Sequence, residues 1–95
     1  MLLQLVAPDK LIFNDEVKMV ILPGAKGEFA VLNGHEHMIT MLTEGTMQIE
    51  RPNNHISVYL IAGLVAKVTP TRCTVLLRRN LDQVYSTSKI ADVKL

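Results

Sequence analysis

Turn-forming residues interrupt this chain about every 8–10 residues, a spacing that suits short strands and excludes long helices over most of its length. The turn signals are the dipeptides Pro8-Asp9, Asn14-Asp15, Pro23-Gly24, Asn33-Gly34 and Pro52-Asn53, together with Gly45, a bulge or tight corner at Gly63, and Pro70. Apolar and polar residues alternate between them, as where Met47 and Ile49 are separated by Gln48. The pattern predicts an all-β fold, a sandwich or barrel of about nine short strands.

The length of 95 residues is that of one small domain with a modest core. A chain of this size buries roughly 60–65% of the surface that its unfolded form exposes. No apolar run approaches the ~20 residues that span a bilayer, and the opening residues lack the basic segment of a signal peptide. The one cysteine, Cys73, cannot form an internal disulfide, which fits a reducing compartment. Its place in a strand predicts an unreactive thiol.

Two segments fit more than one structure. In residues 37–42 the apolar side chains Met38, Ile39, Met41 and Leu42 fit a single helical turn as well as a strand. After residue 80 the spacing changes to three and four, and the apolar residues concerned are Leu81, Val84, Tyr85, Ile90 and Val93. We expect a β-sandwich domain over residues 1–79 and a short tail over residues 80–95 that is at most a marginal helix.

The net charge of +1 gives no reason to expect nucleic acid or an anionic membrane as a partner. Residues 1–50 hold three basic and seven acidic side chains, net −4, whereas residues 51–95 hold seven basic and two acidic side chains, net +5. Arg78-Arg79 is the one basic pair in the sequence, and no aromatic cluster accompanies it to stack on bases. An ordinary solvated surface accounts for this asymmetry.

Few motifs carry enough chemistry to suggest an active site or a ligand site. His35 and His37 are spaced to lie on one face of a strand and could chelate a metal, but Met41 and Leu42 stand where a third ligand is needed. Residues 24–27 look like a phosphate loop without its Lys-Ser/Thr pair or a following helix. No nucleophile motif is present. We expect neither an enzyme nor a cofactor; the alternatives are a free-standing interaction module and a His-x-His metal site.

The stretch from residue 22 to residue 35 resembles a segment of the epsilon subunit of bacterial F-type ATP synthases. It reads Leu-Pro-Gly-Ala-Lys-Gly-Glu-Phe-Ala-Val-Leu-Asn-Gly-His, against Leu-Pro-Gly-x-x-Gly-Glu-Phe-Gly-Val-Leu-Pro-Gly-His in the family. Further segments are similar in the same register, namely residues 5–8, 42–49, 62–70 and 74–76. The resemblance covers about residues 3–77, so loops and strands agree together.

The resemblance implies a sandwich of two five-stranded sheets, about ten short strands in all. It also implies a non-catalytic rotor subunit of the central stalk that binds the gamma subunit and the c ring and so couples proton flow to ATP synthesis. Such a subunit is peripheral at the cytoplasmic face of the bacterial plasma membrane, without inserting into it and without a small-molecule substrate. Carried over by position, the candidate partner-binding residues are Lys26, Gly27, Glu28, Phe29, Asn33, Gly34, His35 and Glu36. We expect their two loops to lie at one end of the contact surface.

The chain also departs from the family. Residues 33–37 read Asn-Gly-His-Glu-His against the family's Pro-Gly-His-Ala-Pro, so the second proline and the small residue are lost and a charge is added, and Lys67 replaces an acidic residue. The family continues past the sandwich into a two-helix hairpin, whereas residues 79–95 make at most about four helical turns. Tyr85 and Ser86 stand where ATP-binding relatives have Arg and Ala. We expect neither inhibition of ATP hydrolysis by a helical tail nor nucleotide binding.

Overall fold

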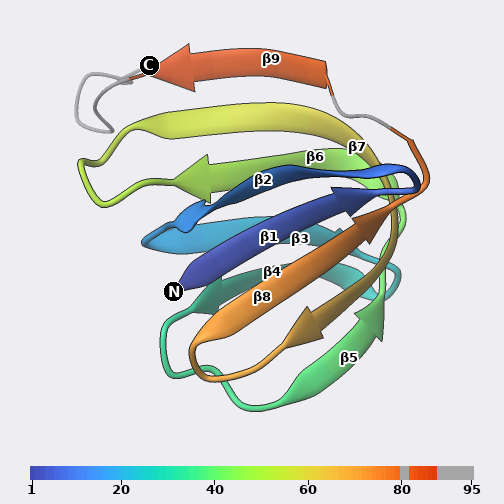
Figure 1. The fold of residues 1–95 in the computed structure, drawn as a ribbon, viewed down its shortest axis with the longest axis horizontal. Coiled ribbons are helices and arrows are strands. Elements are labelled where there is room, and N and C mark those ends of the chain that lie inside the picture. Colours follow the sequence, from blue (N-terminus) through green and yellow to red (C-terminus); the bar gives the residue numbers. More distant parts are fainter. Residues whose placement is uncertain (80–81, 88–95) are drawn as a thin grey trace.

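The structure, a computed structural model, describes residues 1–79 and 82–87, and its regular elements there are all strands (Figure 1). They are β1 (Leu2–Ala7), β2 (Lys10–Glu16), β3 (Met19–Gly24), β4 (Gly27–Leu32), β5 (Met38–Met41), β6 (Glu44–Glu50), β7 (Ile56–Val68), β8 (Arg72–Leu77) and β9 (Asp82–Thr87). The predicted all-β fold is confirmed. Over the same residues there is no helix of the length and apolar character that crossing a bilayer takes.

Two sheets form the layers of the sandwich, and β7 belongs to both. The strand order of the first sheet is β2-β1-β8-β7-β5, with β1 and β8 parallel and the other neighbours antiparallel. The order of the second is β4-β3-β6-β7-β9, with all neighbours antiparallel. Because β7 counts in each sheet, the nine strands of the described residues make two sheets of five.

The 13-residue strand β7 forms the corner between the two sheets. Its first half pairs with β6 and β9, and its second half pairs with β5 and β8. The register with β8 shifts between Gly63 and Val65, so the bulge or corner expected at this glycine is present. A Cβ atom on Gly63 would lie 2.9 Å from the Cβ of Leu42, a separation that requires glycine. The strand therefore continues through Gly63 from the second sheet into the first.

Alternation along the strands produces one apolar core between the sheets. In β1 and β3 every second residue is buried, and the inward side chains of both sheets form a single cluster. Its fully buried members include Leu3, Leu5, Val20, Leu22, Met47, Ile49, Val75 and Leu77. Cys73 belongs to the same cluster, and burial raises the pKa of its thiol to about 12. The thiol stays protonated at neutral pH, as expected for an unreactive strand cysteine.

Strand pairing determines the structure of two segments that the local sequence did not predict. β2 continues through Asn14 and Asp15 to Glu16, so the turn predicted at that dipeptide is wrong. Its ladder with β1 extends as far as the pair of Leu2 and Glu16, and this pairing outweighs the turn propensity of the dipeptide. The strand alternative is the correct one for Met38–Met41, which form β5 because they pair with the second half of β7.

Residues 82–87 do not form the marginal helix considered for the tail. These residues form β9, which pairs with the first half of β7. The spacing of Val84 and Tyr85 fits a helix, but a short isolated helix is marginal, whereas the edge of β7 offers backbone partners from Ile56 to Leu60. The second sheet therefore extends past the boundary expected at residue 79.

The rest of the helical pattern lies outside the described residues, which omit residues 80–81 and 88–95. Leu81, Ile90 and Val93 belong to these segments.

Candidate partner-binding surface

The first group of candidate residues lies on a tight hairpin between β3 and β4. The ladder runs to the end of the hairpin, where Gly24 pairs with Gly27 and only Ala25 and Lys26 form the loop. Gly27 has a φ of 129°, in the region that favours glycine. A Cβ atom on Gly24 would lie 2.6 Å from the carbonyl oxygen of Gly27. The two glycines therefore set the shape of this loop.

Gly24→Ala should destabilise the hairpin and the domain with it. The added methyl group would lie 2.6 Å from the backbone oxygen of Gly27 and 2.9 Å from the ring of Phe29, so the backbone must move. Overpacking of this kind costs about 1–3 kcal/mol, which thermal unfolding followed by circular dichroism would detect as a lower Tm. Thr46→Ala, at an exposed position of β6, is the control. Equal Tm values for Gly24→Ala and the unchanged protein would contradict the close approach.

The second group of candidate residues lies in the connection from β4 to β5, residues 33–37. Gly34 has a φ of 87°, and its N–H donates to the carbonyl of Pro70 at 2.7 Å, which ties this loop to the turn between β7 and β8. Nδ1 of His35 lies 2.8 Å from the carbonyl oxygen of Glu36, within hydrogen-bond distance. Local bonds thus hold the backbone of this loop.

Most of the eight candidate residues are accessible to a partner. The exposed ones are Lys26, Gly27, Glu28, Asn33, Gly34 and Glu36. His35 is half-buried, and Phe29 is half-buried and packs against the core. Phe29 is therefore better placed to anchor the hairpin than to contact a partner.

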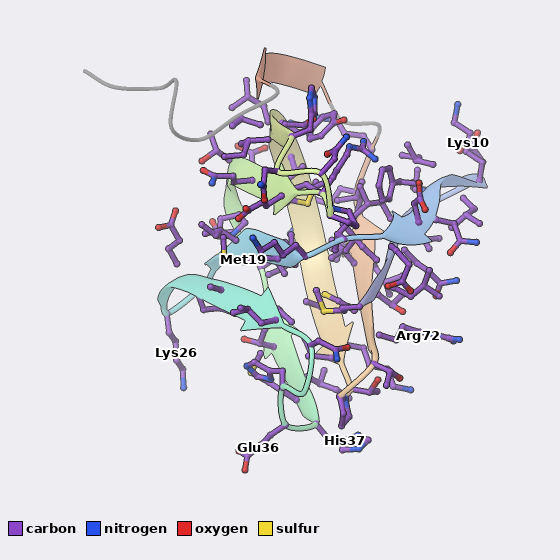
Figure 2. The ribbon with its side chains drawn as sticks, turned by 90° about the vertical axis from the view of Figure 1, so that its left-hand side faces the viewer. Lys10, Met19, Lys26, Glu36, His37 and Arg72 are labelled. Atoms are coloured by element: carbon purple, nitrogen blue, oxygen red, sulfur yellow. The ribbon has the colours of Figure 1, made fainter. Side chains whose placement is uncertain are left out.

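The two loops lie at opposite ends of β4, so the expectation that they sit together at one end is wrong. β4 has six residues, which at ~3.3 Å per residue separates the loops by roughly 20 Å. Figure 2 shows Lys26 projecting from one end of this strand, and Glu36 and His37 from the loop beyond the other. Both loops nevertheless border one side of the molecule, because β4 and β5 are edge strands and each is the lowest strand of its own sheet in Figure 1.

The first sheet carries an apolar surface that sequence reasoning missed. Directly paired residues share a face of a sheet. Across the outer face of the first sheet the pairing aligns one apolar side chain from each strand, and these five residues, which we call the apolar row, are Leu11, Val6, Leu76, Val65 and Met41. Leu11, Leu76 and Met41 are 51%, 39% and 65% exposed. Leu64, beside the bulge, and Ile39, two residues before Met41, enlarge the apolar area.

A shallow groove runs beside the apolar row. Its lining residues are Val6, Ala7, Pro8, Leu64, Leu76 and Leu77. In the second sheet, by contrast, the exposed Leu32 and Leu60 lie on different strands and in different rows. A contiguous exposed apolar patch on a small domain marks an interaction surface. The signal in the sequence was the presence of apolar residues on both faces of a strand, as at Leu5 and Val6.

The same outer face becomes polar and cationic beyond the apolar row. The next row contains Lys67 paired with Thr74, whose hydroxyl donates to Oε1 of Gln4 at 3.3 Å. Arg72 follows in the row after that. These residues border a polar hollow whose lining is Lys67, Thr69, Thr71, Arg72 and Thr74. Polar and cationic residues therefore border the apolar row on this side, and the exposed Arg78, two residues after Leu76, borders it on the other side.

Sequence comparison links the chain to known proteins over most of its length. The model of the β-sandwich domain of the ATP synthase delta/epsilon chain matches residues 1–82. The ATP synthase epsilon chain of Granulibacter bethesdensis is 40% identical over 74 residues, which are 78% of this chain and 55% of that protein. The epsilon chain of Rhodospirillum centenum is 41% identical over 81 residues, 83% of this chain and 56% of that protein. This chain thus spans little more than half the length of these relatives.

Solved structures share the fold. A chain in the cryo-EM structure of Euglena gracilis mitochondrial ATP synthase that includes its c-ring aligns with a TM-score of 0.78 at 25% identity, over 85% of this chain and 51% of that one. A chain in the cryo-EM structure of the central stalk and c-ring of Tetrahymena thermophila mitochondrial ATP synthase aligns with a TM-score of 0.65 at 16% identity, over 84% and 63%. The second likeness is one of fold alone.

Proposed function

This chain belongs to the ATP synthase delta/epsilon chain family, and on that premise we propose that it is a non-catalytic central-stalk subunit that binds the gamma subunit and the c ring. The apolar row supports this role most directly, because a sandwich with its own closed core has no structural need for a line of apolar side chains across the outer face of all five strands of one sheet. In this role the chain transmits rotation driven by proton flow toward ATP synthesis. It then lies peripherally at the cytoplasmic face of the bacterial plasma membrane.

The outer face of the first sheet suits the gamma subunit. A stable contact of standard size buries on the order of 600–1,000 Å² on each partner, and its centre is depleted in charged residues. The apolar row and the adjoining groove carry no charged side chain. A rotor subunit that must remain bound to the gamma subunit during rotation needs such a contact, because exposed ion pairs alone contribute little to affinity.

The two candidate loops suit the c ring. Both border the side of the molecule where the edge strands β4 and β5 lie (Figure 1). Lys26 and Glu28 are exposed at one end of β4, and Glu36 is exposed beyond the other. Charges at the border of an interface set register and specificity more than affinity. Two charged loops roughly 20 Å apart would fix the orientation of the subunit on a repeating ring.

The metal-binding alternative finds no support. Within residues 1–79 and 82–87 no group of three or more His, Cys, Asp or Glu side chains could hold a metal ion. His35 also has one ring nitrogen within hydrogen-bond distance of Glu36. Stoichiometric zinc, iron or manganese in the purified protein would revive this alternative.

The double substitution Glu28→Ala with His35→Ala should weaken incorporation into the synthase without unfolding the domain. Each change removes a side chain from one of the two loops, and neither side chain belongs to the core cluster. A tagged chain expressed in its native host should recover gamma and c subunits, and the variant should recover roughly two- to fivefold less c subunit, as expected for the loss of up to ~1 kcal/mol at an exposed contact.

The matched control is Thr46→Ala with Gln48→Ala, on the outer face of the second sheet. Recovery of neither subunit by the unchanged chain would contradict the proposed function. Equal recovery of c subunit by the double variant and the control would show that these loops are not the c-ring contact.

A further inference from the structure

Given the proposed function, we infer that the part of the gamma subunit covering the apolar row carries acidic side chains that bind Lys67 and Arg72. The apolar row by itself would accept any apolar partner of suitable shape. Lys67 and Arg72 beside the row restrict the partner to one with an apolar stripe and carboxylates alongside that stripe.

Lys67 and Arg72 lie on the same face as the apolar row. On β7, Lys67 follows Val65 by two residues, and on β8, Arg72 precedes Leu76 by four. Side chains separated by an even number of residues on a strand point to the same face. Thr74 pairs directly with Lys67, so Arg72, two residues before Thr74, is the diagonal neighbour of Lys67 across the two strands. The Cα atoms of such diagonal neighbours lie roughly 7–8 Å apart. One partner segment can therefore cover the row and meet both cations.

No carboxylate in the described part of the chain forms an ion pair with either cation. Lys67 has Ile39 beside it on β5, and Arg72 has Leu2 beside it on β1. The acid in that row is Glu16, on the far side of Leu2, and its carboxylate lies 3.0 Å from the N-terminal ammonium group. Both cations are therefore available to an external carboxylate.

The turn between β7 and β8 holds Arg72 at a fixed position beside the polar hollow. The N–H of Thr69 donates to the carbonyl of Arg72 at 2.8 Å, and the N–H of Arg72 donates to Oγ1 of Thr69 at 3.1 Å. In Figure 2 Arg72 extends away from the body of the protein, on the side opposite Lys26, while Glu36 points elsewhere. A guanidinium in this position can bind a carboxylate with two parallel hydrogen bonds.

The position of the two cations favours a protein partner. Stable interfaces combine a charge-poor centre with a polar border, and the apolar row with Lys67 and Arg72 beside it has this arrangement. Charges at the border steer association and reject partners of the wrong sign. An isolated anion would contact only the polar hollow, whereas a protein segment can contact both the polar hollow and the apolar row.

The test is the binding of the cognate gamma subunit to the full 95-residue chain carrying Lys67→Glu and Arg72→Glu, measured by surface plasmon resonance at several salt concentrations. We expect the association rate to fall at least tenfold at 50 mM NaCl and the difference to shrink toward 500 mM, because salt screens the charges. Lys10→Glu with Arg79→Glu is the control, since it makes the same change of net charge at two exposed positions outside the surface formed by Lys67, Arg72 and the apolar row. Circular dichroism checks that all variants are folded.

Each outcome separates this inference from the proposed function. The inference would be overturned if the association rate fell equally in the Lys67→Glu, Arg72→Glu variant and its control, or fell in neither. Gamma binding itself would remain in place in both cases. Failure of the unchanged chain to bind gamma would overturn the proposed function itself. Binding to phosphatidylglycerol vesicles that depends on Lys67 and Arg72, with gamma binding unaffected, would assign these residues to a lipid surface instead. Recovery of the lost rate by a gamma variant with a matching acid-to-lysine change would support the inference.

Discussion

Replacing Leu76 and Met41 together with aspartate should abolish stable binding of the gamma subunit while leaving the sandwich folded. The two side chains are 39% and 65% exposed, so the free domain gains little from them. In a complex they would lie in the desolvated centre, where a carboxylate without a partner is strongly unfavourable. Central interface residues of this kind account for about 2–4 kcal/mol each, so we expect Kd to rise by at least about 100-fold.

The second sheet supplies the matched control for this experiment. Leu32 and Leu60 are each 50% exposed on its outer face, and Leu32→Asp with Leu60→Asp adds the same two charges at similar exposure. The control should bind gamma like the unchanged chain in the same surface plasmon resonance assay. Loss of binding in the control alone would transfer the gamma contact to the second sheet. Equal loss in both would point to a general effect of negative charge rather than to the apolar row.

Sequence reasoning predicted the class of the fold because alternation and turns are local properties. Leu3 and Leu5 alternate with Gln4, and Gly24 and Gly27 stand where the backbone of the β3–β4 hairpin requires glycine. What it could not predict was which strands pair. β2 keeps Asn14 in a strand because β1 lies beside it, and residues 82–87 become a strand because β7 has an open edge. In both segments, pairing with another strand determined the backbone conformation, and local sequence does not show which strands pair.

The candidate site was predictable in part for the same reason. A motif comparison located the exposed loops around Glu28 and His35, because those residues are contiguous in sequence. The apolar row consists of residues 6, 11, 41, 65 and 76, which only the sheet register brings into line. Within a strand that is apolar on both faces, sequence alone does not tell which face meets the core. Leu5 and Val6 illustrate this, since the first is buried and the second lines the outer groove.

Leu3 and Leu2 allow a direct test of which face of β1 meets the core. Leu3 is 0% exposed and belongs to the central cluster, whereas Leu2 is half-buried on the outer face of the same strand. Leu3→Ala removes apolar contacts and leaves a cavity between the sheets, at a cost of about 2–5 kcal/mol. Domains of this size have a total stability of about 5–15 kcal/mol, so this one change should remove a large part of it.

Chemical denaturation in urea would measure the free energy of unfolding for Leu3→Ala, Leu2→Ala and the unchanged chain. Leu2→Ala deletes the same atoms one residue away, and because water already reaches that side chain, no closed cavity forms and the cost should stay near or below about 1 kcal/mol. The midpoint of Leu3→Ala should fall well below that of Leu2→Ala at an unchanged slope, since the fold and the surface exposed on unfolding stay the same. Equal destabilisation by the two variants would mean that both faces of β1 are buried alike. The outer face of the first sheet would then be closed to a partner, and the assignment of the apolar row as the gamma contact would fail with it.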